Sequence, residues 1–199
     1  NNYRAPKSSA GPATDGTAMT IVIAGGTGFL GRALTDVLVG EGHEVVLLSR
    51  HSNDRPRGPR VRVATWIPDG SVGPWASALD GAHTVVNVAG DSIAEGRWNA
   101  DKKRRILDSR VLATRSLAAA IGRAATPPPA FVSGSAVGFY GPLGDEIVTE
   151  DHPAGSDFLA QVCTEWEAEA RRAATPRTRV ALIRTGLVLD KHEGALPRM

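Results

Sequence analysis

The sequence predicts a doubly wound α/β domain built on a parallel sheet. Short apolar runs alternate along the chain with longer segments in which apolar residues recur at helical spacing. The apolar runs are nearly continuous in Val, Ile and Leu, which is typical of parallel strands covered by helices on both faces. A chain of 199 residues is long enough for about one such domain.

Each expected element follows from its own local pattern. Apolar runs predict strands at 20–24, 44–48, 61–66, 84–88, from 130–133, and over 179–189. Helical spacing predicts helices from residue 30 to about 40, at 72–79, over 98–125 and over 157–174. Glycines at 40 and 42 mark the end of the first helix, and three prolines at 127–129 stop the long one.

The two long helices are expected to bury one face each. The apolar residues on these faces are Leu107, Val111, Ala118 and Ile121 in the first helix, and Leu159, Val162, Cys163, Trp166 and Ala170 in the second. A basic run at 102–105 is interpreted as a solvated helix face.

Composition excludes several classes of protein. Hydrophobic residues make up 42% and charged residues 22%, as in globular proteins rather than disordered chains or rods. A net charge of +2 gives no reason to expect a nucleic-acid partner. Cys163 is the only cysteine, so no intramolecular disulfide can form, and a reducing, cytoplasmic setting is expected. The five histidines have no metal-ligand spacing, so no metal is expected.

The ends of the chain carry two further expectations. Residues 1–18 are rich in Ser, Pro, Gly and Ala, and are interpreted as a tag or a flexible extension before a domain over 19–199. No segment approaches the roughly 18 apolar residues of a membrane span, so no membrane partner is expected.

A glycine turn after the first strand indicates dinucleotide binding. The pattern is Gly25-x-x-Gly28-x-x-Gly31, between a strand and a helix. Gly25 permits a tight turn, Gly28 lets the backbone approach a pyrophosphate, and Gly31 allows close packing of helix on strand. The N-terminus of the helix then offers N–H groups to the phosphates. The fold class is therefore a Rossmann-type doubly wound parallel sheet.

The end of the second strand favours NADP over NAD as the cofactor. An NAD-binding protein places a carboxylate there for the ribose hydroxyl. This chain has Ser49-Arg50-His51 instead. The Arg50 guanidinium suits the 2′-phosphate of NADP, because it binds phosphate through paired, charge-assisted hydrogen bonds.

Several motifs together resemble the extended short-chain dehydrogenase/reductase superfamily, and within it the NAD(P)-dependent epimerase/dehydratase-like subfamily, some members of which are named cell-division inhibitors. The motifs span residues 19–199. Besides the glycine turn they are Asn87-x-Ala89-Gly90-x-x-Ile93, Arg97-Trp98, Lys103, Ile106, Ser109-Arg110, Ser133-Gly134-Ser135-Ala136, Tyr140-Gly141, Thr149-Glu150, Trp166-Glu167 and Arg184-Thr185-Gly186.

The resemblance implies a set of cofactor-binding residues. Gly25, Thr27, Gly28, Phe29 and Leu30 would hold the pyrophosphate, Ser49 and Arg50 the 2′-phosphate end, and Val88, Ala89 and Gly90 would line the cofactor. Arg110 would also reach the cofactor from the long helix. Relatives would continue beyond Met199 into a substrate-binding part, which is expected to be mostly absent from this sequence.

The usual catalytic residues of the superfamily are only partly present. They are a Ser or Thr, a Tyr, and a Lys four residues after the Tyr. Ser135 matches the serine, but the helix at 157–174 holds neither Tyr nor Lys, and Tyr140 is followed four residues later by Gly144. Ser135, Tyr140 and Glu150 are the available polar candidates for acid–base work.

Two functions therefore remain open. One is an NADP-dependent oxidoreductase or epimerase that acts on a nucleotide sugar or a small carbonyl compound. The other is a non-catalytic NADP-binding protein with a regulatory or partner-binding role.

Overall fold

The structure is a computed structural model that describes residues 17–51, 54, 58–191 and 193–194. The tag or extension expected at 1–18 lies almost wholly outside these residues.

Six parallel strands form one sheet in the order β3-β2-β1-β4-β5-β6. They are β1 (Thr20–Ala24), β2 (Glu44–Ser49), β3 (Val61–Thr65), β4 (Thr84–Asn87), β5 (Ala130–Ala136) and β6 (Arg179–Thr185). Every pair of neighbours is parallel. Because β4 lies beside β1 rather than beside β3, the chain reverses its direction of travel across the sheet between β1 and β4. This order confirms the predicted doubly wound fold.

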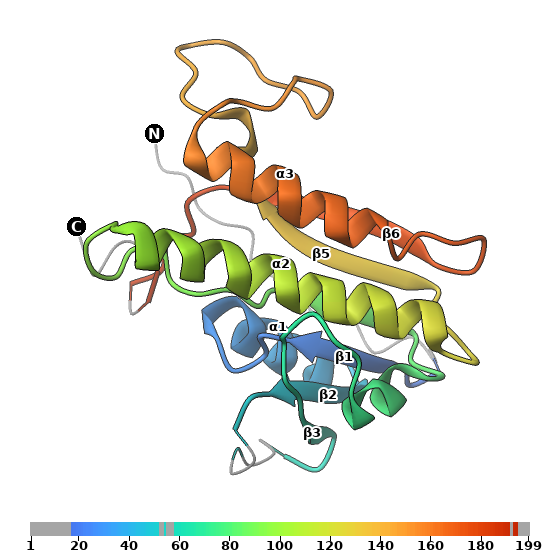
Figure 1. Ribbon diagram of the computed structural model, residues 1–199. Coiled ribbons are helices and arrows are strands. Elements are labelled where there is room, and N and C mark those ends of the chain that lie inside the picture. The colour runs from blue at the N-terminus through green and yellow to red at the C-terminus, as the bar shows by residue number, and fades with distance from the viewer. Residues whose placement is uncertain (1–16, 52–53, 55–57, 192, 195–199) are drawn as a thin grey trace.

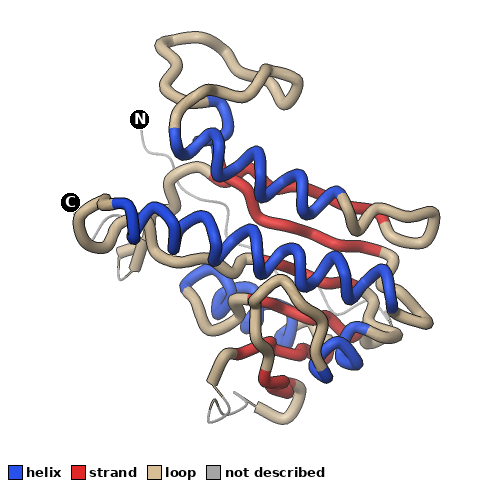
Figure 2. The backbone as a smooth tube through the Cα atoms, viewed as in Figure 1, coloured by secondary structure: helices blue, strands red, loops and turns tan. Residues whose placement is uncertain are grey.

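Helices cover both faces of the sheet. They are α1 (Phe29–Gly40), α2 (Ala100–Arg123) and α3 (Phe158–Arg171), with short 3₁₀ helices η1 (Pro74–Leu79) and η2 (Val137–Tyr140). Figure 1 shows α2 and α3 side by side on the near face, with α1 behind the sheet. Figure 2 shows the strands behind α2 and α3, and a long loop between η2 and α3 that extends away from the sheet.

Each face of the sheet has its own apolar core. Val85, Phe131 and Leu117 belong to the larger cluster, beneath α2 and α3. Ile23 and Leu47 belong to the smaller cluster, beneath α1. The alternation of side chains along a strand places neighbouring apolar residues in different cores, which explains why the strands are continuously apolar.

Most predicted elements are confirmed, and their boundaries move for identifiable reasons. The strand expected to reach 189 ends at Thr185, because β5 ends at Ala136 and these two residues are register partners. The long helix begins after Asn99, whose side chain accepts the Lys102 N–H at 2.8 Å. In the same way α3 begins after Asp157, whose carboxylate caps it.

The predicted helix faces are largely confirmed, with one shift in α2. Leu107 is only half-buried, whereas Ile106 beside it is fully buried. In α3, Leu159 is also half-buried, while Cys163 and Trp166 are buried as predicted. In the described part of the chain, no helix is both long and apolar enough to cross a membrane.

Candidate dinucleotide site

A cavity of about 530 Å³ lies at the carboxyl ends of the central strands. Its walls come from the β1–α1 turn, the ends of β2 and β4, the segment after β3, and one side of α2. The lining residues are Gly25, Thr27, Gly28, Leu48, Ser49, Arg50, His51, Trp66, Pro68, Val88, Ala89, Gly90, Asp91, Arg105, Asp108, Ser109, Leu112 and Ala113. This groove lies where the strand order reverses, which is the ligand position of open α/β sheets.

The three glycines of the turn have different structural roles. Gly25 has a positive φ of 84°, and a Cβ there would lie 2.7 Å from the Ala89 nitrogen. A Cβ at Gly31 would lie 2.2 Å from the Gly25 carbonyl oxygen. Only Gly28 has nearly free space, with that oxygen 3.2 Å away, and it lines the groove. The fold therefore needs Gly25 and Gly31, whereas Gly28 leaves room that a ligand can use.

The N-terminus of α1 is prepared for an anion. Gly28 is the N-cap with an extended backbone, no side chain caps the helix, and the first turn contains no acidic residue. The first N–H groups of a helix have no partner within it and carry the positive end of its dipole. Together with the space at Gly28, this turn fits the pyrophosphate of a dinucleotide. Phe29 and Leu30, predicted to take part, are the first two residues of this helix.

A carboxylate that the sequence did not indicate lies against the end of β2. Ser49 is buried, its hydroxyl donates a hydrogen bond to the Asp54 carboxylate, and its oxygen accepts the His51 N–H at 3.1 Å. Arg50 is exposed and lines the groove. Ser49 therefore shapes the turn that presents Arg50, while Asp54 lies five residues beyond the strand in a segment with no recognisable pattern.

The side chain of Asn87 anchors the turn after β4 to α2. The Asn87 amide donates to Thr114 Oγ1 at 2.8 Å, and its carbonyl oxygen accepts the Ala89 N–H at 3.2 Å. This pairing fixes Val88, Ala89 and Gly90 at the groove wall. The sequence showed Asn87 as part of a motif but gave no sign of its anchoring role.

Arg110 lies behind this turn rather than on the groove surface. A Cβ on Gly90 would meet the Arg110 guanidinium carbon at 3.0 Å, and that carbon lies 5.4 Å from the Trp166 ring centroid. One guanidinium nitrogen donates to the carbonyl oxygens of Asp91 and Ile106, both at 3.1 Å. Burial lowers the pKa of Arg110. Arg110 thus supports the groove wall, and its expected contact with cofactor remains a prediction.

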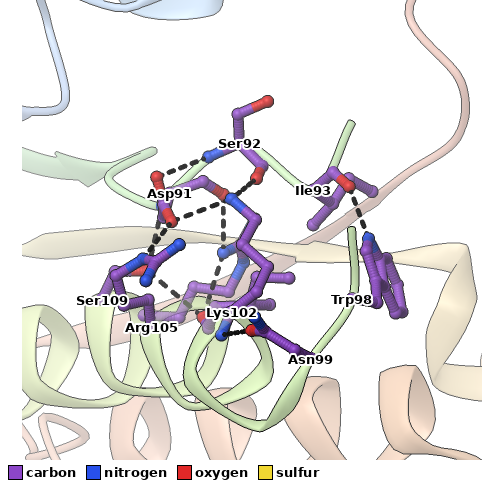
Figure 3. A network of polar contacts seen from close by, with 10 residues as sticks. Asp91, Ser92, Ile93, Trp98, Asn99, Lys102, Arg105 and Ser109 are labelled. Atoms are coloured by element: carbon purple, nitrogen blue, oxygen red, sulfur yellow. Dashed lines mark hydrogen bonds and ion pairs between the residues drawn. The ribbon is translucent and has the colours of Figure 1, made fainter. Parts of the chain in front are cut away.

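The basic run at 102–105 is not uniformly solvated, which corrects the sequence interpretation at one position. Lys102 is only 5% exposed. Its Nζ lies 3.0 Å from Asp91 Oδ2 and donates also to the Ser92 carbonyl oxygen (Figure 3). A lysine is buried when it finds such partners. Asp91 comes from the loop after β4, eleven positions earlier, so the helix pattern alone did not reveal the pair.

Asp91 connects its loop to α2 at several points. Its N–H donates to Ser109 Oγ at 2.9 Å, and Arg105 Nε lies 3.7 Å from its carboxylate. Partial burial raises the pKa of Asp91, but the hydrogen bond and charge of Lys102 lower it more, so the net shift is downward. The carboxylate is therefore ionised at neutral pH.

Figure 3 also shows how the loop continues to the start of α2. The Trp98 indole N–H donates to the Ile93 carbonyl oxygen at 2.9 Å. Trp98 also meets the Phe158 ring edge-on, with centroids 5.8 Å apart. The loop after β4 is thereby tied both to α2 and to the start of α3.

Ser135 and Tyr140, the catalytic candidates, join one network around a buried carboxylate. Ser135 Oγ donates to Glu167 Oε1 at 2.7 Å, and Glu167 is fully buried. Arg184 binds both Glu167 oxygens, at 2.7 and 3.0 Å, and donates to the Tyr140 hydroxyl at 2.8 Å. Glu150 meets the network only through its carbonyl oxygen, 3.0 Å from Arg184.

Two arginines face the buried carboxylate, because Arg171 also donates to Glu167 Oε2 at 3.0 Å. Burial raises the pKa of Glu167, but hydrogen bonds from Arg184 and Ser135 lower it more, and the net shift is downward. The hydrogen bonds to Glu167 also raise the pKa of Arg184. Sequence reasoning listed Glu167 and Arg184 only as motif residues, because their link depends on the packing of α3 against β6.

The face of α3 near Ser135 contains Cys163, which is buried, and no Tyr or Lys. Burial raises the pKa of the Cys163 thiol. The thiol is therefore a small core side chain rather than a replacement for an acid–base group. Among the residues described, no three His, Cys, Asp or Glu side chains gather in a way that could hold a metal ion.

The sheet order, the glycine turn and the groove define a Rossmann-type dinucleotide-binding fold. A model of the NAD dependent epimerase/dehydratase family matches residues 21–195. The chain belongs to this family.

Individual relatives agree with this assignment. The chain is 39% identical over 184 residues to the Bos taurus epimerase family protein SDR39U1, covering 91% of this chain and 58% of the bovine protein. It is 36% identical over 183 residues to a chloroplastic SDR39U1 homolog of Arabidopsis thaliana, covering 91% of this chain and 52% of that protein. The chain thus spans little more than half the length of these curated relatives.

Solved structures give the same result. A nucleoside-diphosphate sugar epimerase from Corynebacterium glutamicum superposes with a TM-score of 0.74 at 40% identity, covering 92% of this chain and 37% of that one. Human SDR39U1 (isoform 2) with NADPH superposes with a TM-score of 0.77 at 37% identity, covering 90% of this chain and 58% of the human one.

Proposed function

We propose that this chain binds NADP(H), in preference to NAD(H), across the carboxyl ends of its central strands. The observation that carries the proposal is the groove itself, where the uncapped N-terminus of α1 and the space at Gly28 lie in one cavity with Arg50. The human relative of known structure, solved with NADPH, supports the choice of cofactor.

Different groups of residues would bind the different parts of the cofactor. The β1–α1 turn, with Gly25, Thr27 and Gly28, would bind the pyrophosphate through backbone N–H groups. Arg50 would pair with the 2′-phosphate. Val88, Ala89 and Gly90 would orient the nicotinamide half, held in place by Asn87. When bound, the nicotinamide ring supplies hydride transfer.

We propose further that the protein to which this chain belongs is a cytoplasmic epimerase or oxidoreductase. The family assignment supports the class of reaction, and the C. glutamicum neighbour favours a nucleotide sugar over a small carbonyl compound as substrate. The single cysteine favours the cytoplasmic location. Ser135 and Tyr140 are the candidates for proton transfer, with Glu150 nearby.

The hydrogen-bond network around Glu167 favours a second function. The Ser135 hydroxyl donates to Glu167, and the Tyr140 oxygen is bound by Arg184, so both groups already have partners. The residues facing Ser135 from α3 include no Tyr or Lys. These observations support a non-catalytic protein that binds NADP(H) as a sensor or as a signal for a partner.

Titration with NADPH and NADH tests the cofactor proposal. A charge-assisted hydrogen bond contributes about 1.5–3 kcal/mol, so Arg50→Ala should weaken NADPH binding by about 10- to 100-fold. NADH binding should hardly change. Arg104→Ala is the matched control, since Arg104 is an exposed α2 arginine paired with Asp101 and is not among the groove residues. Equal affinity of the parent chain for the two cofactors would contradict the proposal.

A further inference from the structure

Two carboxylates of the described residues line the groove in which the cofactor's phosphates would lie: Asp108, which is exposed to water on α2, and Asp91, which is partly buried. Asp91 follows Gly90 in the loop after β4, and its side chain is 37% exposed. An ionised carboxylate in the same cavity repels phosphates, and the repulsion is stronger where water is partly excluded. A groove built for a dinucleotide therefore needs this charge to be balanced.

Lys102 provides that balance from the protein side. Its ammonium lies 3.0 Å from Asp91 Oδ2, and its side chain is only 6% exposed, so water cannot screen the pair effectively. Arg105 approaches the same oxygen at 3.7 Å, but its side chain is 63% exposed, so its contribution is weaker and it remains free to turn toward a ligand. Lys102 is the fixed partner of Asp91.

The burial of Lys102 needs an explanation that helix packing does not give. Removing an ammonium group from water is unfavourable, and a buried ion pair is often no more stable than an apolar pair of similar volume. The α2 helix already has a large apolar face with Ile106 and Leu117 at its centre. A cation at position 102 instead changes the electrostatic potential of the groove through Asp91.

We propose that Lys102 acts through Asp91 as an electrostatic positioning residue, which cancels the carboxylate's repulsion of the cofactor phosphates without touching the cofactor. This inference rests on the proposed function, since it assumes that the groove holds NADP(H). Asp91 still attaches its loop to α2, while the positive charge of Lys102 compensates the charge of its carboxylate. The role depends on charge, and so it differs from a purely structural tether.

The test compares NADPH affinity in four folded proteins at about 10 mM and about 500 mM salt. They are the parent chain, Asp91→Asn, Lys102→Met and the double variant Lys102→Met/Asp91→Asn. Lys103→Met is the matched control, because it removes the same charge one position along α2, where the lysine lies over Phe158 at 5.2 Å and outside the groove lining. Thermal unfolding of each protein separates stability from binding.

The charge role predicts a particular order of affinities at low salt. Lys102→Met should bind NADPH about tenfold more weakly than the parent, because the Asp91 charge is then uncompensated. Asp91→Asn should bind at least as tightly as the parent. The double variant should return to within about threefold of the parent, and high salt should shrink the Lys102→Met deficit. Lys103→Met should change affinity by less than about twofold.

Two results would overturn the inference. One is a double variant that binds as weakly as Lys102→Met, and the other is a deficit that does not respond to salt, since both are expected of a tether. If Lys102→Met does not fold, Asp91→Asn and the neutral double variant still decide, because a tether predicts that both lose affinity. A parent chain that binds no NADPH refutes the proposed function itself, whereas NADPH binding with the wrong order of variants refutes only this inference.

Discussion

An added side chain should abolish NADPH binding at one glycine of the β1–α1 turn and lower the stability of the fold at another. At Gly28 the backbone has φ −78° and ψ 175°, which any residue adopts, and a Cβ would meet only the Gly25 oxygen at 3.2 Å. Gly28→Val should therefore lower the free energy of unfolding by only about 1 kcal/mol, mostly through a poorer N-cap. Its side chain would fill the space that the pyrophosphate needs, so NADPH binding should be lost.

At Gly31 an added side chain affects the fold instead. A Cβ there would lie 2.2 Å from the Gly25 oxygen and 2.5 Å from the Gly26 Cα, both backbone atoms. Overpacking of this kind typically costs about 1–3 kcal/mol or more, so Gly31→Ala should unfold at a clearly lower temperature even without ligand.

Thermal unfolding with and without NADPH separates the two effects. NADPH at 100 times its Kd stabilises a protein that binds it by about 2.7 kcal/mol. For a domain of this size that is a rise of about 5–11 °C in Tm. The parent should show this rise, and Gly28→Val should lose it while keeping a Tm close to that of the unliganded parent. A Gly28→Val protein that keeps the full rise would refute the placement of the phosphates at this turn.

Two further outcomes follow from buried groups. Glu167→Gln should destabilise the protein by about 3–5 kcal/mol, because it leaves Arg184 and Arg171 without their charged partner. The Glu167 pKa is depressed in the folded state, so its contribution is present above the unfolded value of about 4.3 and is lost as pH falls through the folded value. Urea unfolding from pH 7 down to pH 3 should show the parent's advantage over Glu167→Gln shrinking in that acid range, and a constant difference would contradict the assignment. Cys163 is buried and is the sole cysteine, so thiol reagents should label the native protein far more slowly than the unfolded one; equal rates would show that α3 does not pack as described.

The fold was predictable because its signals are local. Strand runs such as Thr20–Ala24, the helical spacing and the glycine turn each lie within a few consecutive residues. The error in the predicted end of the last strand, by contrast, arises from pairing with a distant strand. Apolar residues continue after β6 as far as Leu189. The backbone pairing of β6 with β5 nevertheless stops at Thr185, because β5 ends at its partner Ala136.

The groove was only partly predictable, because several of its parts depend on contacts between distant segments. Gly25, Gly28 and Arg50 could be assigned from their places next to strands. The burial of Lys102 could not, since a lysine in a basic helical run is ordinarily solvated unless a loop supplies a carboxylate. Asp54 was missed for a similar reason, because its bond to Ser49 crosses a turn without sequence signature.

The catalytic question depends on what α3 holds beside Ser135. The non-catalytic alternative predicts that a version of this protein with the additional length of its relatives binds NADPH but shows no hydride exchange with nucleotide sugars or carbonyls at a rate typical of the superfamily. General acid–base groups typically contribute 10²–10⁴-fold, so their absence should be plain in a single assay.

Leu159→Tyr with Cys163→Lys would introduce the missing spacing in that longer protein. Cys163 is buried close to Arg110, whose positive charge acts on the thiol, so a lysine there would face a second buried cation. The pair of substitutions should therefore lower stability. If exchange appears in the double variant, only the chemistry was missing. If the unmodified longer protein already turns over NADPH quickly, the non-catalytic reading is wrong, and Ser135 and Tyr140 become the first residues to substitute.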